Sequence, residues 1–325
     1  MKRFVIIGML LSLLCPLTFA QTLNIRTGNV TWQFPALQAG EMQFAGGTTL
    51  TVMGKTFALS DVAQMYIDDS AVKDSTVSVV YAGTTASVTV AGNIAQFITV
   101  AQSGAHLSFT QRDDLAMEIT YRLSGSSSNG EFYTSGSFKT TIELDNLTLT
   151  NAAPVYSGAA LHVQNGKRIN IKVLTGTTNT LRDASTGSQK GALYIKGHAE
   201  FKQYGTLNVY GNLKHAIKTG EYFSVKNATI NILSAVGDGI NCSQYFLMES
   251  GTVTISAAGD DGIQCDLDDP DAGSTGETTD HEGEDSGNVY IQGGTLRITC
   301  DDDGIKAAGQ IVHTGGEVWV NGKQL

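Results

Sequence analysis

The chain has 325 residues, of which 41% are hydrophobic and only 16% are charged, with 37 Gly, 4 Pro and 4 Cys. This apolar share excludes a disordered chain, and the low charge leaves a surface rich in Ser, Thr, Asn and Gln. The net charge of −10 argues against a nucleic-acid-binding protein, so we expect no nucleic-acid partner.

The first segment of the chain, residues 1–20, has the features of a secretory signal peptide. Lys2 and Arg3 precede an apolar run from Phe4 to Leu14, and Ala20 ends a group of small residues that suits a cleavage site. We expect cleavage after Ala20 and a product that is secreted, periplasmic or attached to the cell surface. The apolar run is too short to span a bilayer, and no other run is longer, so no transmembrane segment is expected.

The C-terminal half contains an internal repeat of 23 residues. Alternating apolar segments with a leading Thr begin at Thr206, Thr229 and Thr252, and Asp-Gly-Ile begins at Asp238 and Asp261 with the same spacing. Independent markers that share one period indicate a repeat architecture. The alternation within each repeat predicts short strands with one buried face.

A unit of about three short strands cannot bury its apolar face alone, so neighbouring repeats must stack. The sequence therefore predicts an all-β fold of the parallel β-helix type, a solenoid with about 23 residues per coil. An up-and-down sandwich is the alternative, although it does not require identical residues at a constant interval. In the β-helix one internal ladder is expected to contain Ile217, Ile240, Ile263 and Ile305.

The repeat pattern also predicts the domain organisation. After the signal peptide, residues 21–76 are less regular, and we expect them to form a leader or a cap over the end of the solenoid. Residues 77–325 are expected to form the β-helix, with alternating strands near Val77, Val88 and Ile98 as its first coils. The acidic segment 266–287 has almost no apolar residues, and it is either a projecting loop insertion or disordered.

Other ordered motifs occur at 123–130, 166–169, 176–181, 196–201, 205–209 and 214–217, followed by the Asp-Gly-Ile series. Together they resemble a bacterial carbohydrate-binding family typified by a clostridial protein that binds cellulose and acidic sugars. The resemblance extends from Val77 to Gly316. It implies a right-handed parallel β-helix similar to that of pectate lyases, bound calcium, and binding of cellulose or polygalacturonate without established catalysis.

Acidic residues gather near the C-terminal end, where residues 260–303 hold 14 of the 31 carboxylates. Aspartates one repeat apart should lie on neighbouring strands, where two charges ~5 Å apart repel by about 3 kcal/mol at an effective dielectric constant near 20. Such a column must raise its pKa values or bind a cation, and calcium takes several carboxylate oxygens. The predicted calcium ligands are Asp238, Asp260, Asp261, Asp301, Asp302 and Asp303. The alternative is that each Asp only satisfies its own Asp-Gly turn.

The middle of the chain is basic, since residues 160–226 hold ten Lys or Arg and three carboxylates. Tyrosines lie among these lysines, and exposed aromatic rings stack on sugars while Lys attracts uronates. The predicted polysaccharide-binding residues are Lys190, Tyr194, Lys196, Lys202, Tyr204, Lys214 and Lys218. An ordinary solvated basic face remains the alternative.

The cysteines allow at most one bridge once the signal peptide is removed. Cys242 and Cys265 lie one repeat apart and should face inward on adjacent coils, at a spacing that a disulfide tolerates. They form either a disulfide or two small apolar fillers in a ladder.

These observations predict an exported, non-catalytic protein that binds polysaccharide, either cellulose or acidic glycans such as polygalacturonate, and contains structural calcium. The main alternative is a calcium-dependent, pectate-type polysaccharide lyase, for which Lys306 beside the acidic cluster is the candidate base. A structural or adhesive surface solenoid is a third possibility. We expect a monomer.

Overall fold

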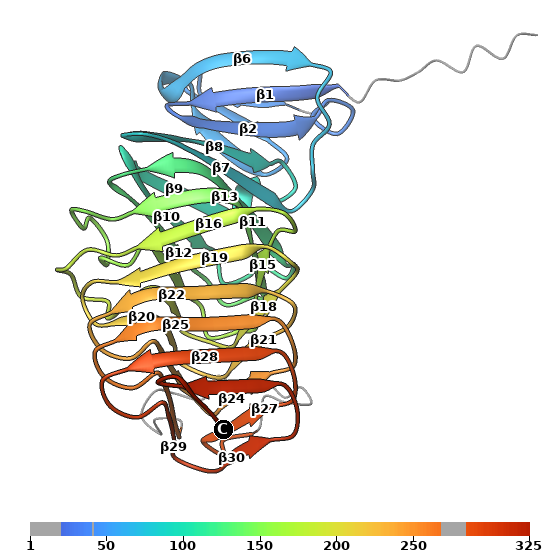
Figure 1. Cartoon of the computed structure of the whole chain (residues 1–325). Coiled ribbons are helices and arrows are strands. Elements are labelled where there is room, and N and C mark those ends of the chain that lie inside the picture. Colours follow the sequence, from blue (N-terminus) through green and yellow to red (C-terminus); the bar gives the residue numbers. More distant parts are fainter. Residues whose placement is uncertain (1–20, 41, 268–283) are drawn as a thin grey trace, which may run out of the picture.

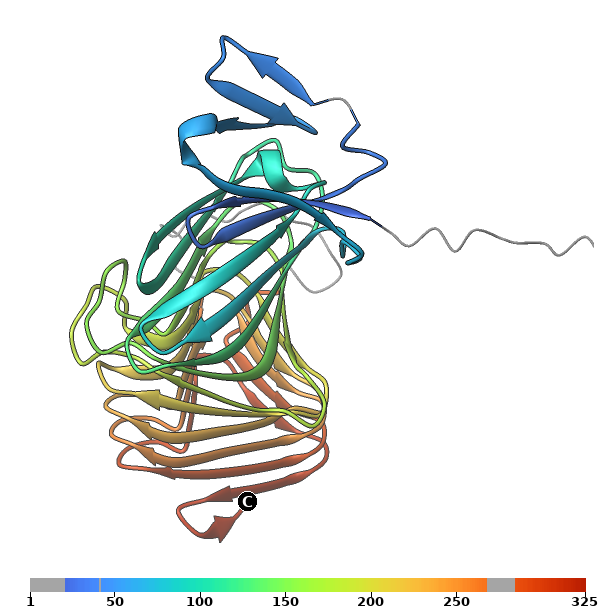
Figure 2. The same ribbon diagram turned by 90° about the horizontal axis from the view of Figure 1, so that it is seen from above.

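The computed structural model describes residues 21–40, 42–267 and 284–325, and within these ranges the elements are strands and two short 3-10 helices. The all-β prediction is confirmed. Figures 1 and 2 show the strands stacked in layers along one axis, from the blue N-terminal strands at one end to the red C-terminal strands at the other. None of the helices in the described ranges is long and apolar enough to cross a bilayer. The predicted signal peptide lies outside the described residues.

The repeats contribute strands to three parallel series. The nine-stranded sheet contains β9 (Ile98–Ser103), β10 (Ala105–Gln111), β12 (Gly130–Ser135), β14 (Leu161–Gln164), β17 (Gly191–Ile195), β20 (His215–Thr219), β23 (Ile240–Ser243), β26 (Ile263–Asp266) and β29 (Ile305–Ala307). In this sheet every pair from β10 and β12 onward is parallel.

The other two series both start at β13 (Thr140–Thr150) and belong to one large sheet. The series that we call the β15 series continues through β15 (Ile169–Val173), β18 (Ala199–Lys202), β21 (Phe223–Val225), β24 (Tyr245–Met248), β27 (Asn288–Ile291) and β30 (Ile311–His313). The β16 series contains β16 (Thr178–Arg182), β19 (Thr206–Gly211), β22 (Thr229–Ala235), β25 (Thr252–Ala258), β28 (Thr295–Cys300) and β31 (Glu317–Val320). Its strands face the viewer in Figure 1, from yellow β19 to red β28.

The predicted isoleucine ladder is confirmed. Ile217 pairs with Ile240, Ile240 with Ile263 and Ile263 with Ile305, and the first three side chains are fully buried. Stacking continues elsewhere in the interior, where the rings of Phe223 and Phe246 lie parallel with centroids 5.1 Å apart. The constant interval therefore places equivalent apolar residues over one another, and this buries a core that no single repeat could form.

The glycine of each Asp-Gly-Ile motif makes room for a core side chain. A Cβ atom on Gly262 would lie 2.3 Å from Cγ2 of Ile298, and one on Gly304 would lie 2.4 Å from Cγ1 of Val320. On Gly239 it would meet Ile255 at 2.9 Å. Turn chemistry alone does not explain these glycines, because the β16 series packs directly against them.

Most strand pairs in the N-terminal part are antiparallel. It contains β1 (Thr22–Thr27), β2 (Val30–Pro35), β3 (Gln43–Ala45), β4 (Thr49–Val52), β5 (Lys55–Ala58), the 3-10 helix Leu59–Asp61, β6 (Val62–Asp68), β7 (Thr76–Ala82), β8 (Thr85–Ala91) and the 3-10 helix Ala95–Phe97. Strand β1 pairs antiparallel with β2 and β6, and β3, β4 and β5 form a separate antiparallel sheet.

The strands predicted at Val77, Val88 and Ile98 exist, but they are not successive coils of a parallel stack, because β7 pairs antiparallel with β8 and β9 pairs antiparallel with β10. Strands β7 and β8 form an antiparallel hairpin through a tight turn at Gly83, whose φ is +67°. Strands β2 and β8 pair in parallel, and the continuous run of parallel pairs begins where β11 (Ile119–Ser127) joins β7 and β13. At the other end, β31 turns back into the short β32 (Lys323–Gln324). The role of residues 21–76 as a cap stays a prediction, and most of the predicted 266–287 loop lies outside the described residues.

Candidate functional site

Five of the six predicted metal ligands gather at the start of β23, β26 and β29. Carboxylate oxygens of Asp238, Asp260 and Asp261 lie within 4.8 Å of one another, and the same holds for those of Asp261, Asp302 and Asp303. Asp238 and Asp261 are fully buried. Asp301 follows directly on the last residue of β28 and belongs to neither group. The shared Asp261 makes the two groups one cluster, which we call the acidic cluster.

Asp238 is a fully buried carboxylate of the acidic cluster. Its Oδ2 accepts a hydrogen bond from Nδ2 of Asn241 at 2.8 Å and lies 3.1 Å from Nδ1 of His215. Burial alone would raise the pKa of Asp238, but the hydrogen bonds and charge of these neighbours outweigh it, so the pKa lies below its ordinary value. The other oxygen, Oδ1, is buried and has no hydrogen-bond partner among the described residues. An ionised carboxylate with an unpartnered buried oxygen fits a cation ligand.

Both carboxylate oxygens of Asp261 accept hydrogen bonds. Its Oδ1 accepts the backbone N–H of Asp303 at 3.1 Å, and its Oδ2 accepts a hydrogen bond from Nζ of Lys306 at 3.0 Å. The Asp261 carboxylate raises the pKa of Lys306 by hydrogen bonding and charge. Lys306 is therefore held in its protonated form as an ion-pair partner, and a protonated amine cannot accept a proton from a substrate.

The same sheet carries an outward column of aromatic and polar side chains. Tyr133 pairs with His162, His162 with Tyr194 and Tyr194 with Lys218. The rings of Tyr133 and His162 lie 4.6 Å apart, and those of His162 and Tyr194 lie 4.8 Å apart, both edge to face. The column continues through Asn241, Gln264 and Lys306. It therefore leads from aromatic rings to the acidic cluster.

Three of the lysines that the sequence predicts to bind polysaccharide lie where the column changes from aromatic to charged side chains. The Lys218 ammonium donates to Oδ1 of Asn241 at 2.7 Å, which links it through that amide to Asp238. Burial, followed by the charge of Lys214, lowers the pKa of Lys218. The exposed Lys190 and Lys214 each directly precede a strand of this sheet, β17 and β20. We call Tyr133, His162, Tyr194, Lys190, Lys214 and Lys218 the glycan face, because the sequence predicts that four of them bind polysaccharide.

The other predicted binding residues do not join this face. Lys202 lies on β18 in the β15 series, where it donates to Glu200 and Asn170. Tyr204 follows that strand and is 69% exposed, and Lys196 lies in the turn that leaves β17. The predicted set is therefore split, because the chain turns a corner between β17 and β18 and residues close in sequence come to face different sides.

Sequence reasoning missed Tyr133 and His162, since the repeats that contain them are longer than 23 residues and lack the constant spacing. It also missed Glu131, which is fully buried beside this face. Its carboxylate accepts the backbone N–H groups of Val155, Tyr156, Ser157 and Gly158. This anchors the loop that places the Tyr156 ring 6.2 Å from that of Tyr133.

Cys242 and Cys265 are partners on β23 and β26, as their spacing predicts, and both side chains are buried. The structure contains them as free thiols, so the disulfide alternative is not realised in it. Burial raises the pKa of Cys242, which keeps its thiol protonated and unreactive.

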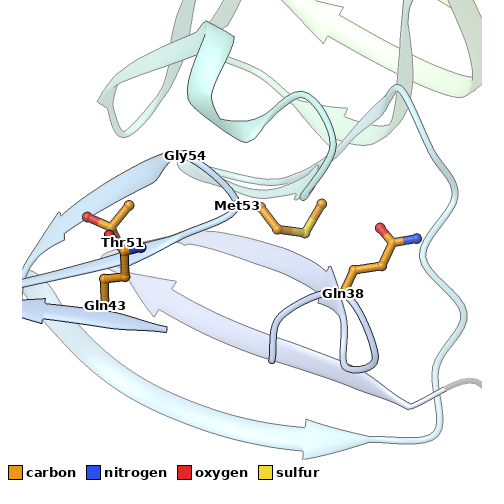
Figure 3. A pocket seen from close by; sticks show the side chains of 5 residues that line it. All are labelled: Gln38, Gln43, Thr51, Met53 and Gly54. Atoms are coloured by element: carbon orange, nitrogen blue, oxygen red, sulfur yellow. The ribbon is translucent and has the colours of Figure 1, made fainter. Parts of the chain in front are cut away.

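A separate pocket of about 420 Å³ lies in the N-terminal part (Figure 3). Gln38, Gln43, Thr51, Met53 and Gly54 line it. This lining offers amides, a hydroxyl and a thioether but no ionisable side chain, and none of its residues belongs to the acidic cluster or the glycan face.

Comparison with known proteins gave two matches. The model of a family described as "Carbohydrate-binding domain-containing protein" matches residues 114–324. A solved structure of a polysaccharide lyase-like protein from C. thermocellum, a gadolinium derivative, is similar with a TM-score of 0.55 and 19% identity, over 76% of this chain and 95% of that chain. At this identity the similarity shows the fold alone. No curated protein matches.

Proposed function

The chain belongs to the carbohydrate-binding domain family, and from this membership we propose that it is an exported, non-catalytic protein that binds polysaccharide through the glycan face. We further propose that its stacked repeats form a right-handed parallel β-helix, which the three parallel strand series support.

The observation that carries the proposal is the register of Tyr194 with Lys218 on the nine-stranded sheet. A tyrosine ring offers an apolar surface to the face of a sugar ring, and a lysine one strand away offers a positive charge to a uronate carboxylate. Tyr133 and His162 extend the aromatic part along the same column. A linear anionic glycan lying along the axis would contact both kinds of side chain.

The acidic cluster would hold a calcium ion. Its donors are all carboxylate oxygens, the ligand type that calcium prefers, and the free oxygen of Asp238 needs a positive partner. Asp238, Asp260, Asp261, Asp302 and Asp303 would hold the ion, which would neutralise their mutual repulsion. Because Asn241 connects Asp238 to Lys218, the same ion would also stabilise the basic end of the glycan face.

A polysaccharide lyase is the second candidate function. Only the position of Lys306 beside the carboxylates favours it, and its ion pair with Asp261 works against a role as a base. Binding without catalysis is therefore the function that the geometry supports better.

Retention of the purified chain in native gels containing polygalacturonate, with calcium or with a chelator, tests the proposal. We expect retardation with calcium and weaker retardation with the chelator, and no ultraviolet-absorbing unsaturated product in solution. Absence of retention on polygalacturonate, cellulose and other glycans alike would exclude the binding function. Formation of the unsaturated product would instead establish the lyase.

A further inference from the structure

The outer side of the β16 series carries two columns of uncharged polar side chains. The first column consists of Thr178, Thr206, Thr229, Thr252 and Thr295, which pair with one another on successive strands. The second consists of Thr180, Asn208, Asn231 and Thr254. All of these side chains are partly or fully exposed. Nδ2 of Asn231 donates to Oδ1 of Asn208 at 3.0 Å, so at this step the column is held in a fixed geometry.

A pocket of about 320 Å³ lies at the C-terminal end of these columns. Arg297 and Trp319 occupy the next two positions of the second column and line the pocket, together with the hydroxyl-bearing Thr254, Ser256 and Thr299. The Arg297 guanidinium lies 5.1 Å from the centre of the Trp319 ring. Its charge is offset by Glu317, whose carboxylate lies 3.8 Å away. The indole Nε1 of Trp319 is buried and has no hydrogen-bond partner among the described residues.

The chemistry of this surface differs from that of the glycan face. Threonine hydroxyls and asparagine amides both donate and accept hydrogen bonds, and the columns hold no charge before the Arg297–Glu317 pair. A surface of this kind complements a neutral polymer whose hydroxyl groups also donate and accept. The strands repeat every ~4.8 Å, so an extended chain along the axis meets the same groups at each strand. Trp319 adds an aromatic side chain for a sugar ring, and the pocket lies within the size range of small-ligand sites.

We infer that the β16 series is a second glycan-binding face, which takes a neutral linear polysaccharide along its threonine and asparagine columns and one sugar unit in the Trp319 pocket. The inference rests on the proposed function, because it assumes that this chain binds polysaccharide at all. It is independent of the glycan face and of calcium, since the two faces belong to different strand series.

Depletion of the protein from solution by microcrystalline cellulose, a neutral and insoluble glycan, tests the inference. Trp319→Ala removes the aromatic side chain, and Thr229→Lys places a long charged side chain in the middle of the first column without touching the core. Each variant is expected to bind cellulose about tenfold more weakly, as loss of a principal contact does, and to keep its retardation by polygalacturonate. Tyr194→Ala, on the glycan face, is the matched control. It should keep its binding to cellulose and lose retardation by polygalacturonate.

The Thr229→Lys variant keeps the test informative if Trp319→Ala fails to fold, since Thr229 points outward. Cellulose binding that is unchanged in both variants overturns the second face. Retention of the parent chain by polygalacturonate but not by cellulose also overturns it, and leaves the proposed function standing. No retention by either glycan would remove the proposed function itself.

Discussion

Nζ of Lys306 lies 3.0 Å from Oδ2 of Asp261, so a half-exposed ammonium is paired with a fully buried carboxylate of the acidic cluster. The pair gives that buried carboxylate a positive partner. It also means that the lysine competes with any cation that the cluster binds, because both require the oxygens of Asp261.

Replacement of Lys306 should therefore strengthen calcium binding. Lys306→Met keeps the length of the side chain and removes its charge, so the cluster gains one unpaired negative charge. We expect about a fivefold lower Kd for calcium, since one ionic contact near the surface contributes on the order of 1 kcal/mol. Calorimetric titration measures it, and a Kd that rises would show that Lys306 supports the site.

Loss of the negative charge at Asp238 should weaken calcium binding. Saturating calcium at a hundred times Kd stabilises a protein by about 2.7 kcal/mol, and Asp238→Asn should lose most of this gain because its amide cannot replace a charged ligand. Thermal unfolding with and without calcium measures the difference. Asp69→Asn, an exposed carboxylate in the N-terminal part, is the control and should keep the full calcium effect.

Substitutions on the glycan face should weaken binding to anionic glycans. Lys218→Met removes a charge within the column, and we expect a loss of about 1–3 kcal/mol in binding to oligogalacturonate. Lys202→Met is the matched control, because Lys202 lies in the β15 series and pairs with Glu200. Equal losses in the two variants would show that net charge, rather than this face, determines binding.

The close packing around the Asp-Gly-Ile glycines predicts that replacing one of them with alanine destabilises the protein. Gly262→Ala would place a methyl group against Ile298, and overpacking of this kind costs about 1–3 kcal/mol. Chemical denaturation should show that loss in the free energy of unfolding. Gly40→Ala is the control, because its Cβ would meet only a carbonyl oxygen at 4.0 Å. A Gly262→Ala variant with the same free energy of unfolding as the parent would mean that the β16 series packs less tightly against β26 than described.

Asp183 should make stability depend on pH. Burial raises its pKa from 3.8 to about 6, so the folded protein binds this proton more tightly than the unfolded chain. The resulting stabilisation is complete below pH 3.8 and is lost as the pH rises through about 6. Relative to the parent, Asp183→Asn should therefore gain up to about 3 kcal/mol of stability across this interval. A difference between the two chains that stays constant with pH would contradict the raised pKa.

The constant interval of 23 residues was enough to predict which residues share a ladder, including the isoleucines and the paired Cys242 and Cys265. It also brought five of the predicted aspartates together, because they precede equivalent strands. It could not place Tyr133 and His162, whose repeats are longer, or separate Lys202 from Lys218, because the corner between two strands leaves no periodic signal. The antiparallel pairing of β7 with β8 depends on one tight turn, which alternation of apolar residues does not reveal.

A crystal structure of the chain with calcium and an oligogalacturonate tests the central claim most directly. We predict density for the sugar rings along Tyr133, His162 and Tyr194, a uronate carboxylate near Lys218, and an ion among Asp238, Asp261 and Asp303. An oligosaccharide bound elsewhere on the chain, with the column from Tyr133 to Lys218 left free, would contradict the assignment of the glycan face.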